Sequence, residues 1–167
     1  MNTPVQIPDE EVDVQYRRIL RETEQGGYHL NPDVAFSKAL IHGIMVNEQR
    51  YGYGACPCRL AVNDRAADLD IICPCDYRDP DLLQYGACYC ALYVSNAVFQ
   101  GVQPVPVVPE RRPPQDQRQK PAQHRVPSGL PFPVWRCRVC GYLCAREGPP
   151  EICPVCRASK DRFEKFF

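Results

Sequence analysis

The chain lacks the features of three broad classes of protein. Its 20 basic and 20 acidic residues leave no excess of positive charge, which disfavours a protein that binds nucleic acid over its surface. No run of residues approaches the roughly 18 apolar residues of a membrane-spanning helix. The first 15 residues, MNTPVQIPDEEVDVQ, are acidic and contain no hydrophobic stretch, so no secretory signal is expected. These absences predict a cytoplasmic protein with neither a nucleic-acid nor a membrane partner.

Two residue types are instead abundant, with 11 cysteines and 18 prolines in 167 residues. Nine of the prolines fall between Pro104 and Pro133, in a segment without cysteine or hydrophobic period. Such a segment favours extended polyproline II geometry and builds no core of its own. We therefore expect a Pro-rich linker over residues 102–133, with a proline-rich recognition segment as the alternative.

The linker divides the chain into two modules of opposite charge. Residues 1–101 carry 8 basic and 14 acidic residues, whereas residues 134–167 carry 7 basic and 4 acidic residues. The two modules are therefore able to attract one another or different partners.

Two helices are predicted in the first module. Acidic residues at its start, an apolar stripe through Val12, Tyr16 and Ile19, and the following glycines predict a helix over residues 9–25. The sequence Asn31-Pro32-Asp33 predicts a second helix, with Asn31 as its N-cap, that ends near residue 50.

Six cysteines of the first module form three Cys-x-Cys pairs. Without an export signal, a framework of structural disulfides explains them poorly. Clustered thiolates in such a chain point to an iron–sulfur or zinc site, or to thiol redox chemistry. The pairs are Cys56 with Cys58, Cys73 with Cys75, and Cys88 with Cys90.

The number of cysteines narrows these possibilities. A cubane [4Fe–4S] cluster needs four thiolates, which leaves two for a redox-active disulfide. Two cysteines that flank one residue rarely bridge without strain, so the remaining two would come from different pairs. A zinc site with four thiolates also leaves two cysteines, so the spacing alone leaves both readings open.

Residues 28–101 resemble the catalytic subunit of ferredoxin:thioredoxin reductase. The resemblance rests on Asn31-Pro-Asp and its helix, CPCR at 56–59, CPC at 73–75, and a Cys-x-Cys followed by ALYV at 91–94. It implies a mainly α-helical iron–sulfur domain that takes single electrons from ferredoxin and reduces a protein disulfide, such as that of a thioredoxin-like protein. That family's plant-type enzyme has a second, variable subunit that nothing here resembles, so the module acts alone or as a homo-oligomer.

The resemblance also implies roles for the six cysteines. Cys58 and Cys90 would form the active-site disulfide, in which Cys58 attacks the substrate and the Cys90 sulfur is held by the cluster. The ligands of one [4Fe–4S] cluster would be Cys56, Cys73, Cys75 and Cys88.

Two departures from the family concern the surroundings of the dithiol. Tyr89 stands where the family has a histidine thought to handle protons. A phenol with a reference pKa near ~10 is a poor proton shuttle, so Tyr89 either donates a hydrogen bond to a thiolate or only packs. The longer interval before Cys88 leaves open whether the substrate is thioredoxin itself. Arg59 and Arg78 could tune the electrostatics of the thiols or of the cluster, but we expect both to be exposed to solvent.

The second module, residues 134–167, is below the size that normally folds without a metal or disulfides. Two Cys-x-x-Cys motifs predict a metal site with four thiolates. The motifs WxCxxCGY, PPxxCPxC and SKxxFE resemble rubredoxin, which implies a small β domain and one mononuclear iron. A zinc ribbon is the alternative, because such a site accepts either metal. The ligands would be Cys137, Cys140, Cys153 and Cys156.

Two residues depart from the rubredoxin pattern. Arg157 follows the second motif where a glycine is common, and Cys144 stands where an aromatic residue is usual. We expect Cys144 to be a small buried residue. The sequence as a whole predicts an α+β protein in which a disulfide reductase domain is joined to a rubredoxin-like electron relay. A non-enzymatic electron carrier and a zinc-binding interaction protein are the alternatives.

Overall fold

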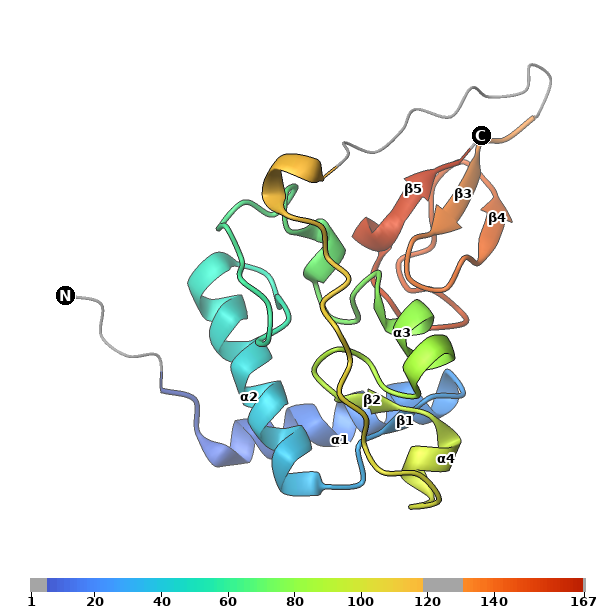
Figure 1. Cartoon of the computed structure of the whole chain (residues 1–167). Coiled ribbons are helices and arrows are strands. Elements are labelled where there is room, and N and C mark those ends of the chain that lie inside the picture. The colour runs from blue at the N-terminus through green and yellow to red at the C-terminus, as the bar shows by residue number, and fades with distance from the viewer. Residues whose placement is uncertain (1–5, 119–130, 167) are drawn as a thin grey trace.

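A computed structural model describes residues 6–118 and 131–166, and it places a mainly helical module beside a small β module (Figure 1). The expected α+β organisation is therefore confirmed. No helix of these two ranges is long and apolar enough to cross a membrane. The elements are α1 (Asp9–Gln25), β1 (His29–Leu30), α2 (Val34–Tyr51), η1 (Leu69–Ile71), α3 (Arg78–Tyr85), β2 (Tyr93–Val94), α4 (Asn96–Phe99), η2 (Gln115–Gln117), β3 (Val134–Cys137), β4 (Leu143–Ala145), η3 (Lys160–Arg162) and β5 (Phe163–Lys165).

The two predicted helices are present, with one change at a cap. Helix α1 spans the predicted residues 9–25, and α2 ends at Tyr51, one residue beyond the predicted end. The N-cap of α2 is Asp33, whose carboxylate accepts a hydrogen bond from the Phe36 N–H, and not Asn31 as predicted. The Asn31 amide instead donates to the Ala91 carbonyl at 3.0 Å, which ties the start of α2 to the loop of the third cysteine pair.

The core of the first module lies between α1, α2 and a two-stranded antiparallel sheet. Strand β1 pairs with β2, with Leu30 opposite Tyr93. Helices α1 and α2 pack against each other and close this core through Val12 and Ile41, both of which are buried. The partly buried Cys90 also packs against the core, so the third cysteine pair is anchored in it.

The second module is a three-stranded antiparallel sheet in the order β4-β3-β5. Phe163 is buried in its core, and Trp135 and Tyr142 pack against it. Most of the other buried residues in this small core are cysteines, so the module depends on what those thiols hold.

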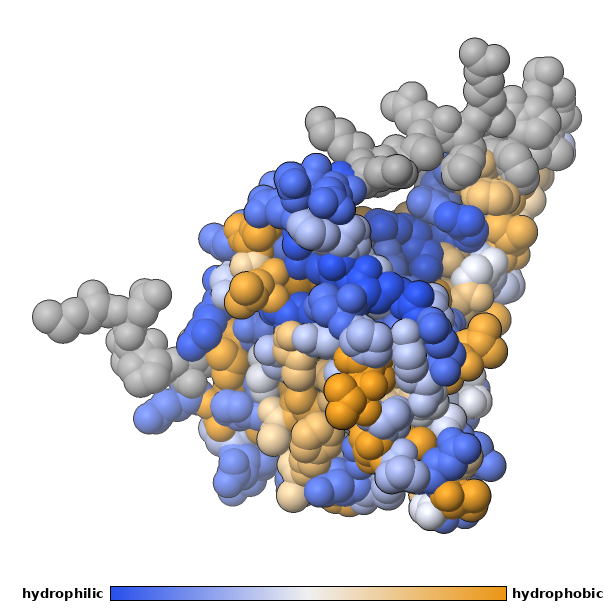
Figure 2. Space-filling view, viewed as in Figure 1, coloured by the Kyte–Doolittle hydropathy of each residue, from blue (hydrophilic) through white to orange (hydrophobic). Residues whose placement is uncertain are grey.

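The part of the predicted linker that the structure describes does not behave as a free tether. Val108 is buried in an apolar cluster of the first module, and Arg112 is only 8% exposed. Arg112 forms ion pairs with Asp68 and Asp70, while Glu110 pairs with Arg59. Figure 2 shows hydrophilic residues gathered over the upper part of the face along which this segment runs in Figure 1, with more apolar residues below them. Residues up to 118 therefore lie against the first module, and residues 119–130 of the predicted linker are outside the described ranges.

The second module docks on the first through ion pairs. Asp76 accepts from Arg138 at 2.6 Å and also from Arg162, which is 1% exposed. On another part of the same interface, Arg65 pairs with Asp161. Burial raises the pKa of Asp76 to about 6, although the two arginines oppose the shift. The interface thus joins the acidic module to the basic one at defined residues.

Candidate functional site

The three Cys-x-Cys pairs come together beside α2. The first two pairs lie side by side, because the Cys56 N–H donates to the Ile71 carbonyl and the Cys73 N–H to the Gly54 carbonyl. The third pair precedes β2, where the Cys88 N–H donates to the Tyr93 carbonyl. Long-range backbone hydrogen bonds therefore join the first two motifs, which are separated by 14 residues in the sequence, whereas the bond of the third motif is local.

Helix α2 approaches the first pair closely at a glycine. A Cβ atom on Gly43 would lie 2.7 Å from the Pro57 Cβ, which is closer than two carbon atoms can pack. The absence of a side chain at Gly43 therefore lets Pro57 rest on the helix and sets the position of the first cysteine pair.

The four predicted cluster ligands are electrostatic neighbours of one another. Burial raises the pKa of the Cys73 thiol, and the nearby Cys56, Cys75 and Cys88 raise it further. Cys56, Cys75 and Cys88 are at most 7% exposed. This arrangement brings together four thiols, and ionising all four at once is costly unless a cation compensates their charge.

The two predicted active-site cysteines lie close to Cys56, which is one of these four. The sulfur atoms of Cys56, Cys58 and Cys90 all lie within 4.8 Å of one another. Cys58 is exposed, whereas Cys90 is partly buried and its sulfur lies 3.6 Å from that of Cys88. The structure holds Cys58 and Cys90 as separate thiols, so the bond between them stays a prediction.

The environment shifts the pKa values of the Cys58 and Cys90 thiols in opposite directions. Hydrogen bonds from Cys56 and then Cys90 lower the pKa of the Cys58 thiol, and the charge of Arg59 lowers it further. Hydrogen bonds to Cys56 and Cys58 raise the pKa of the Cys90 thiol, as does its burial. The exposed Cys58 is therefore the better nucleophile of the two, because the thiolate is the reactive form.

Arg59 and Arg78 are not exposed, contrary to the prediction. Arg59 is 6% exposed and Arg78 is 1% exposed. The Arg59 Nη1 donates to the Cys75 sulfur at 3.3 Å, while the charge of Arg78 acts on the Cys73 thiol. Each thiol of the second Cys-Pro-Cys motif therefore has its own buried guanidinium.

Tyr89 is held by Arg59. The Arg59 guanidinium lies 4.6 Å from the centre of the Tyr89 ring and 4.7 Å from that of Tyr77, within cation–π distance of both. Tyr89 therefore packs against Arg59, which is one of the two roles expected for it. Within the described residues, no hydrogen bond links its hydroxyl to a cysteine. Its predicted catalytic role remains a prediction.

The residues around the four thiols fit an iron–sulfur cluster. Four buried thiolates would carry a net negative charge that iron offsets only in part. The two buried arginines beside Cys73 and Cys75 supply the positive charge and the sulfur-directed hydrogen bond that such a group requires. The assignment of Cys56, Cys73, Cys75 and Cys88 as the ligands that would hold it stays a prediction.

The second module contains a compact site of four thiols. Their sulfur atoms all lie within 4.8 Å of one another, and the Cys137–Cys156 and Cys140–Cys153 distances are both 3.6 Å. Metal–sulfur bonds of about 2.3 Å in a tetrahedron give sulfur–sulfur distances close to this value. The geometry therefore fits one mononuclear metal ion, either iron or zinc.

Cys144 lies outside this site. It occupies β4 opposite Trp135 and packs against the core of the module, partly buried. It is absent from both cysteine groups found within the described residues. Its position agrees with a packing role, although it is less buried than expected.

The fold and the two cysteine sites define a two-module protein, in which a helical thiol-rich domain is joined to a small domain of the rubredoxin type. Residues 7–107, more than half of the chain, match the family of the ferredoxin thioredoxin reductase catalytic beta chain. The chain belongs to this family. Residues 135–164 match the rubredoxin-like domain of rubrerythrin. The first match extends beyond residue 101, the predicted end of the reductase domain.

Two curated relatives are similar to the second module alone. Rubrerythrin from Nitratidesulfovibrio vulgaris is 53% identical over 30 residues, which are 18% of this chain and 16% of that protein. Reverse rubrerythrin-1 from Clostridium acetobutylicum is 55% identical over 29 residues, which are 17% of this chain and 16% of that protein. The chain therefore spans about a sixth of the length of these relatives, and the likeness concerns the rubredoxin-like domain.

Sequence reasoning missed the residues that surround the cysteines. The position of Arg59 beside the site could have been predicted, because it follows Cys58 in the sequence. Its hydrogen bond to the Cys75 sulfur could not. Nothing in the sequence pattern pointed to Asp76 or Arg112 as partners across modules and segments.

Proposed function

We propose that the chain is an iron–sulfur disulfide reductase that takes single electrons from ferredoxin and reduces the disulfide of a thioredoxin-like protein. Membership of the reductase family supports the reaction class. The observation that carries the proposal is the exposed Cys58 thiol within 4.8 Å of the less accessible Cys90 sulfur, beside the buried Cys56. The proposed domains are residues 1–101, a linker over 102–133, and residues 134–167.

The chain's own cysteines account for the exchange steps. The Cys58 thiolate attacks one sulfur of the substrate disulfide, and the departing substrate sulfur takes up a proton. Cys90, which lies within reach, then attacks the Cys58 sulfur, releases the second substrate thiol and closes the Cys58–Cys90 bond. Two electrons and two protons reopen that bond. A [4Fe–4S] cluster, if held by Cys56, Cys73, Cys75 and Cys88, would supply these electrons one at a time.

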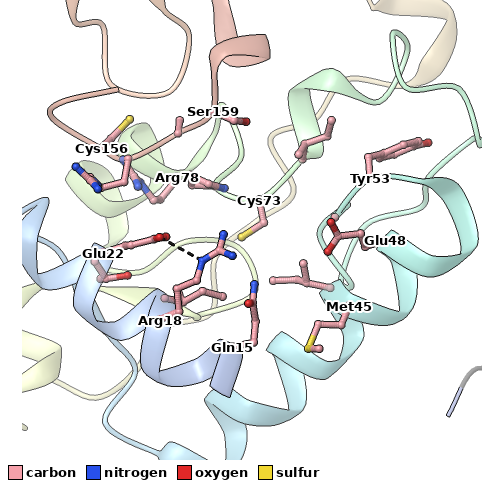
Figure 3. A pocket seen from close by; sticks show the side chains of 18 of the residues that line it. Gln15, Arg18, Glu22, Met45, Glu48, Tyr53, Cys73, Arg78, Cys156 and Ser159 are labelled. Atoms are coloured by element: carbon pink, nitrogen blue, oxygen red, sulfur yellow. Dashed lines mark hydrogen bonds and ion pairs between the residues drawn. The ribbon is translucent and has the colours of Figure 1, made fainter. Parts of the chain in front are cut away.

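The second module is proposed as an electron relay that works from a docked position. Cys73 of the first site and Cys156 of the second line one groove between the modules (Figure 3). The ion pairs at Asp76 hold the modules in this arrangement. A relay therefore requires no movement of the second module along a tether.

Metal analysis of anaerobically purified protein tests the cofactor assignment. One [4Fe–4S] cluster and one mononuclear iron require about five irons and four sulfides per chain. Zinc without sulfide would instead favour a zinc-binding interaction protein.

Two further measurements separate a reductase from an electron carrier. Cys58→Ser should keep the iron and sulfide content but lose disulfide reduction, whereas Cys56→Ser should lose the cluster. Rapid mixing with reduced ferredoxin should bleach the ferric absorption of the second module before thiols appear. Full disulfide reduction by Cys58→Ser would contradict the proposed role of this residue.

A further inference from the structure

A groove of about 490 Å³ lies between the two modules, on the side of Cys73 that faces Cys156 (Figure 3). Its walls come from α1, α2 and the second Cys-Pro-Cys motif on one side, and from residues 156–159 on the other. Neither Cys58 nor Cys90 lines it. The groove is therefore distinct from the proposed dithiol.

Arginines dominate the charge of this groove. Four of them line it, against the two acidic residues Glu22 and Glu48. Three of the four have carboxylate partners, since Arg18 pairs with Glu22, Arg65 with Asp161 and Arg78 with Asp79. Arg78 nevertheless keeps one unused donor, and Arg157 has no carboxylate partner among the residues that the structure describes.

Arg78 carries an unused donor in a buried position. Its side chain is 1% exposed, and its Nε donates to Asp79 at 2.8 Å. Its Nη2 has no hydrogen-bond partner among the residues that the structure describes. The Tyr28 ring, whose centre lies 3.7 Å from the guanidinium carbon, fixes the plane of the group. A buried, charged donor without a partner is costly, which indicates that a ligand or ordered water meets it here.

Arg157 provides a second unused donor from the opposite module. Its Nε is buried and has no hydrogen-bond partner within residues 6–118 and 131–166, and no carboxylate there pairs with its side chain. Its backbone has φ of 63°, in the left-handed region that favours glycine. An arginine in this strained conformation is consistent with a role for its side chain.

We propose that this groove binds a tetrahedral oxyanion, a phosphate or sulfate group, between Arg78 of the first module and Arg157 of the second. Guanidinium groups suit such anions because they offer parallel donors in a fixed plane. The bound anion would satisfy both unused donors and link the two modules. The proposal goes beyond disulfide reduction and does not depend on it.

Calorimetric titration of the intact holoprotein with inorganic phosphate, in chloride buffer of matched ionic strength, tests the proposal. Saturable binding is expected. The key variant is Arg157→Gly, which removes the guanidinium and suits the positive φ, so it should fold. Loss of one charge-assisted hydrogen bond of ~1.5–3 kcal/mol should weaken binding by about tenfold to a hundredfold. Arg157→Gln, which keeps most of the side chain, should weaken it similarly.

Arg146→Gln is the matched control, because Arg146 is an exposed arginine of the same module outside the groove. It should bind phosphate as the parent protein does. The proposal is overturned if phosphate does not bind saturably, or if Arg157→Gly and Arg146→Gln bind it equally well. Sulfate should compete with phosphate, and acetate binding as tightly as either would overturn the assignment to a tetrahedral anion. None of these results depends on reductase activity.

Discussion

Replacement of Arg112 by alanine tests whether residues 104–118 belong to the folded first module. The Arg112 Nε lies 2.8 Å from an Asp70 oxygen, and its Nη2 lies 2.9 Å from the other and 3.0 Å from an Asp68 oxygen. Its Nη1 donates to the Leu60 carbonyl at 2.9 Å. The substitution removes all of these contacts together.

The expected loss in the free energy of unfolding follows from the carboxylates that Arg112 leaves without a cationic partner. Asp68 is fully buried and would lose its cationic partner, although it keeps hydrogen bonds from the Tyr53 hydroxyl at 2.7 Å and from the Val62 N–H. Removal of one member of a buried ion pair costs about 3–5 kcal/mol, and the remaining hydrogen bonds place this case at the lower end. With a urea dependence of about 1–3 kcal/mol per molar, the unfolding midpoint should fall by about 1–3 M.

Anaerobic urea unfolding followed by far-ultraviolet circular dichroism measures this shift. The control is Lys160→Ala, which breaks an ion pair between a 52% exposed lysine and Glu151, which is 80% exposed. Such surface pairs contribute about 0–1 kcal/mol. If Arg112→Ala moves the midpoint no further than Lys160→Ala, the segment does not stabilise the module and the reasoning is refuted.

Three further predictions concern polar residues of the first module. Arg59→Gln should lower the reduction potential of the cluster, because it removes a positive charge beside Cys75. The shift should be about 60 mV if the lost contact is equivalent to a tenfold change in a one-electron couple. An unchanged potential in a redox titration would contradict this. Tyr89→Phe should reduce disulfides within about twofold of the parent, because the ring keeps its contact with Arg59; a tenfold loss of turnover would instead assign a role to the hydroxyl. Burial tends to raise the pKa of Asp70, but hydrogen bonds from Arg112 and Tyr77 outweigh it and hold the pKa below 3.8. The resulting stability is present above the ordinary pKa and is lost as the pH falls through the lowered one, so unfolding midpoints of Asp70→Asn should depend less on pH below 4 than those of the parent.

The helices of the first module could be predicted because their signals are local. The acidic first turn and the glycines after residue 25 are sufficient to place both ends of α1. The cap of α2 was assigned to the wrong member of Asn31-Pro32-Asp33, because both side chains suit an N-cap. The amide of Asn31 is bound to Ala91, 60 residues away, and a local pattern contains no information on that partner.

The cysteines of the second module could likewise be predicted as one site, because each Cys-x-x-Cys motif is itself a local unit. The surroundings of the first site could not. Most arginines are exposed, so exposure was the natural expectation for Arg59 and Arg78. Their burial depends on Tyr77, Tyr89 and Tyr28, and on carboxylates that only the fold brings into contact. The composition of residues 102–118 also predicted a linker, because a proline-rich sequence does not reveal that Arg112 pairs with Asp68 and Asp70.

The contact between Gly43 and Pro57 bears on attempts to make the protein more heat-resistant. Helix propensity alone would recommend alanine at an interior helix position occupied by glycine, with a gain of about 0.5–1 kcal/mol. Here the added methyl group would meet a rigid proline ring 2.7 Å away and displace the first cysteine pair. Engineering that ranks sites by secondary structure alone would therefore seek thermal tolerance at Gly43 and lose the alignment of the first cysteine pair, because of one added carbon atom.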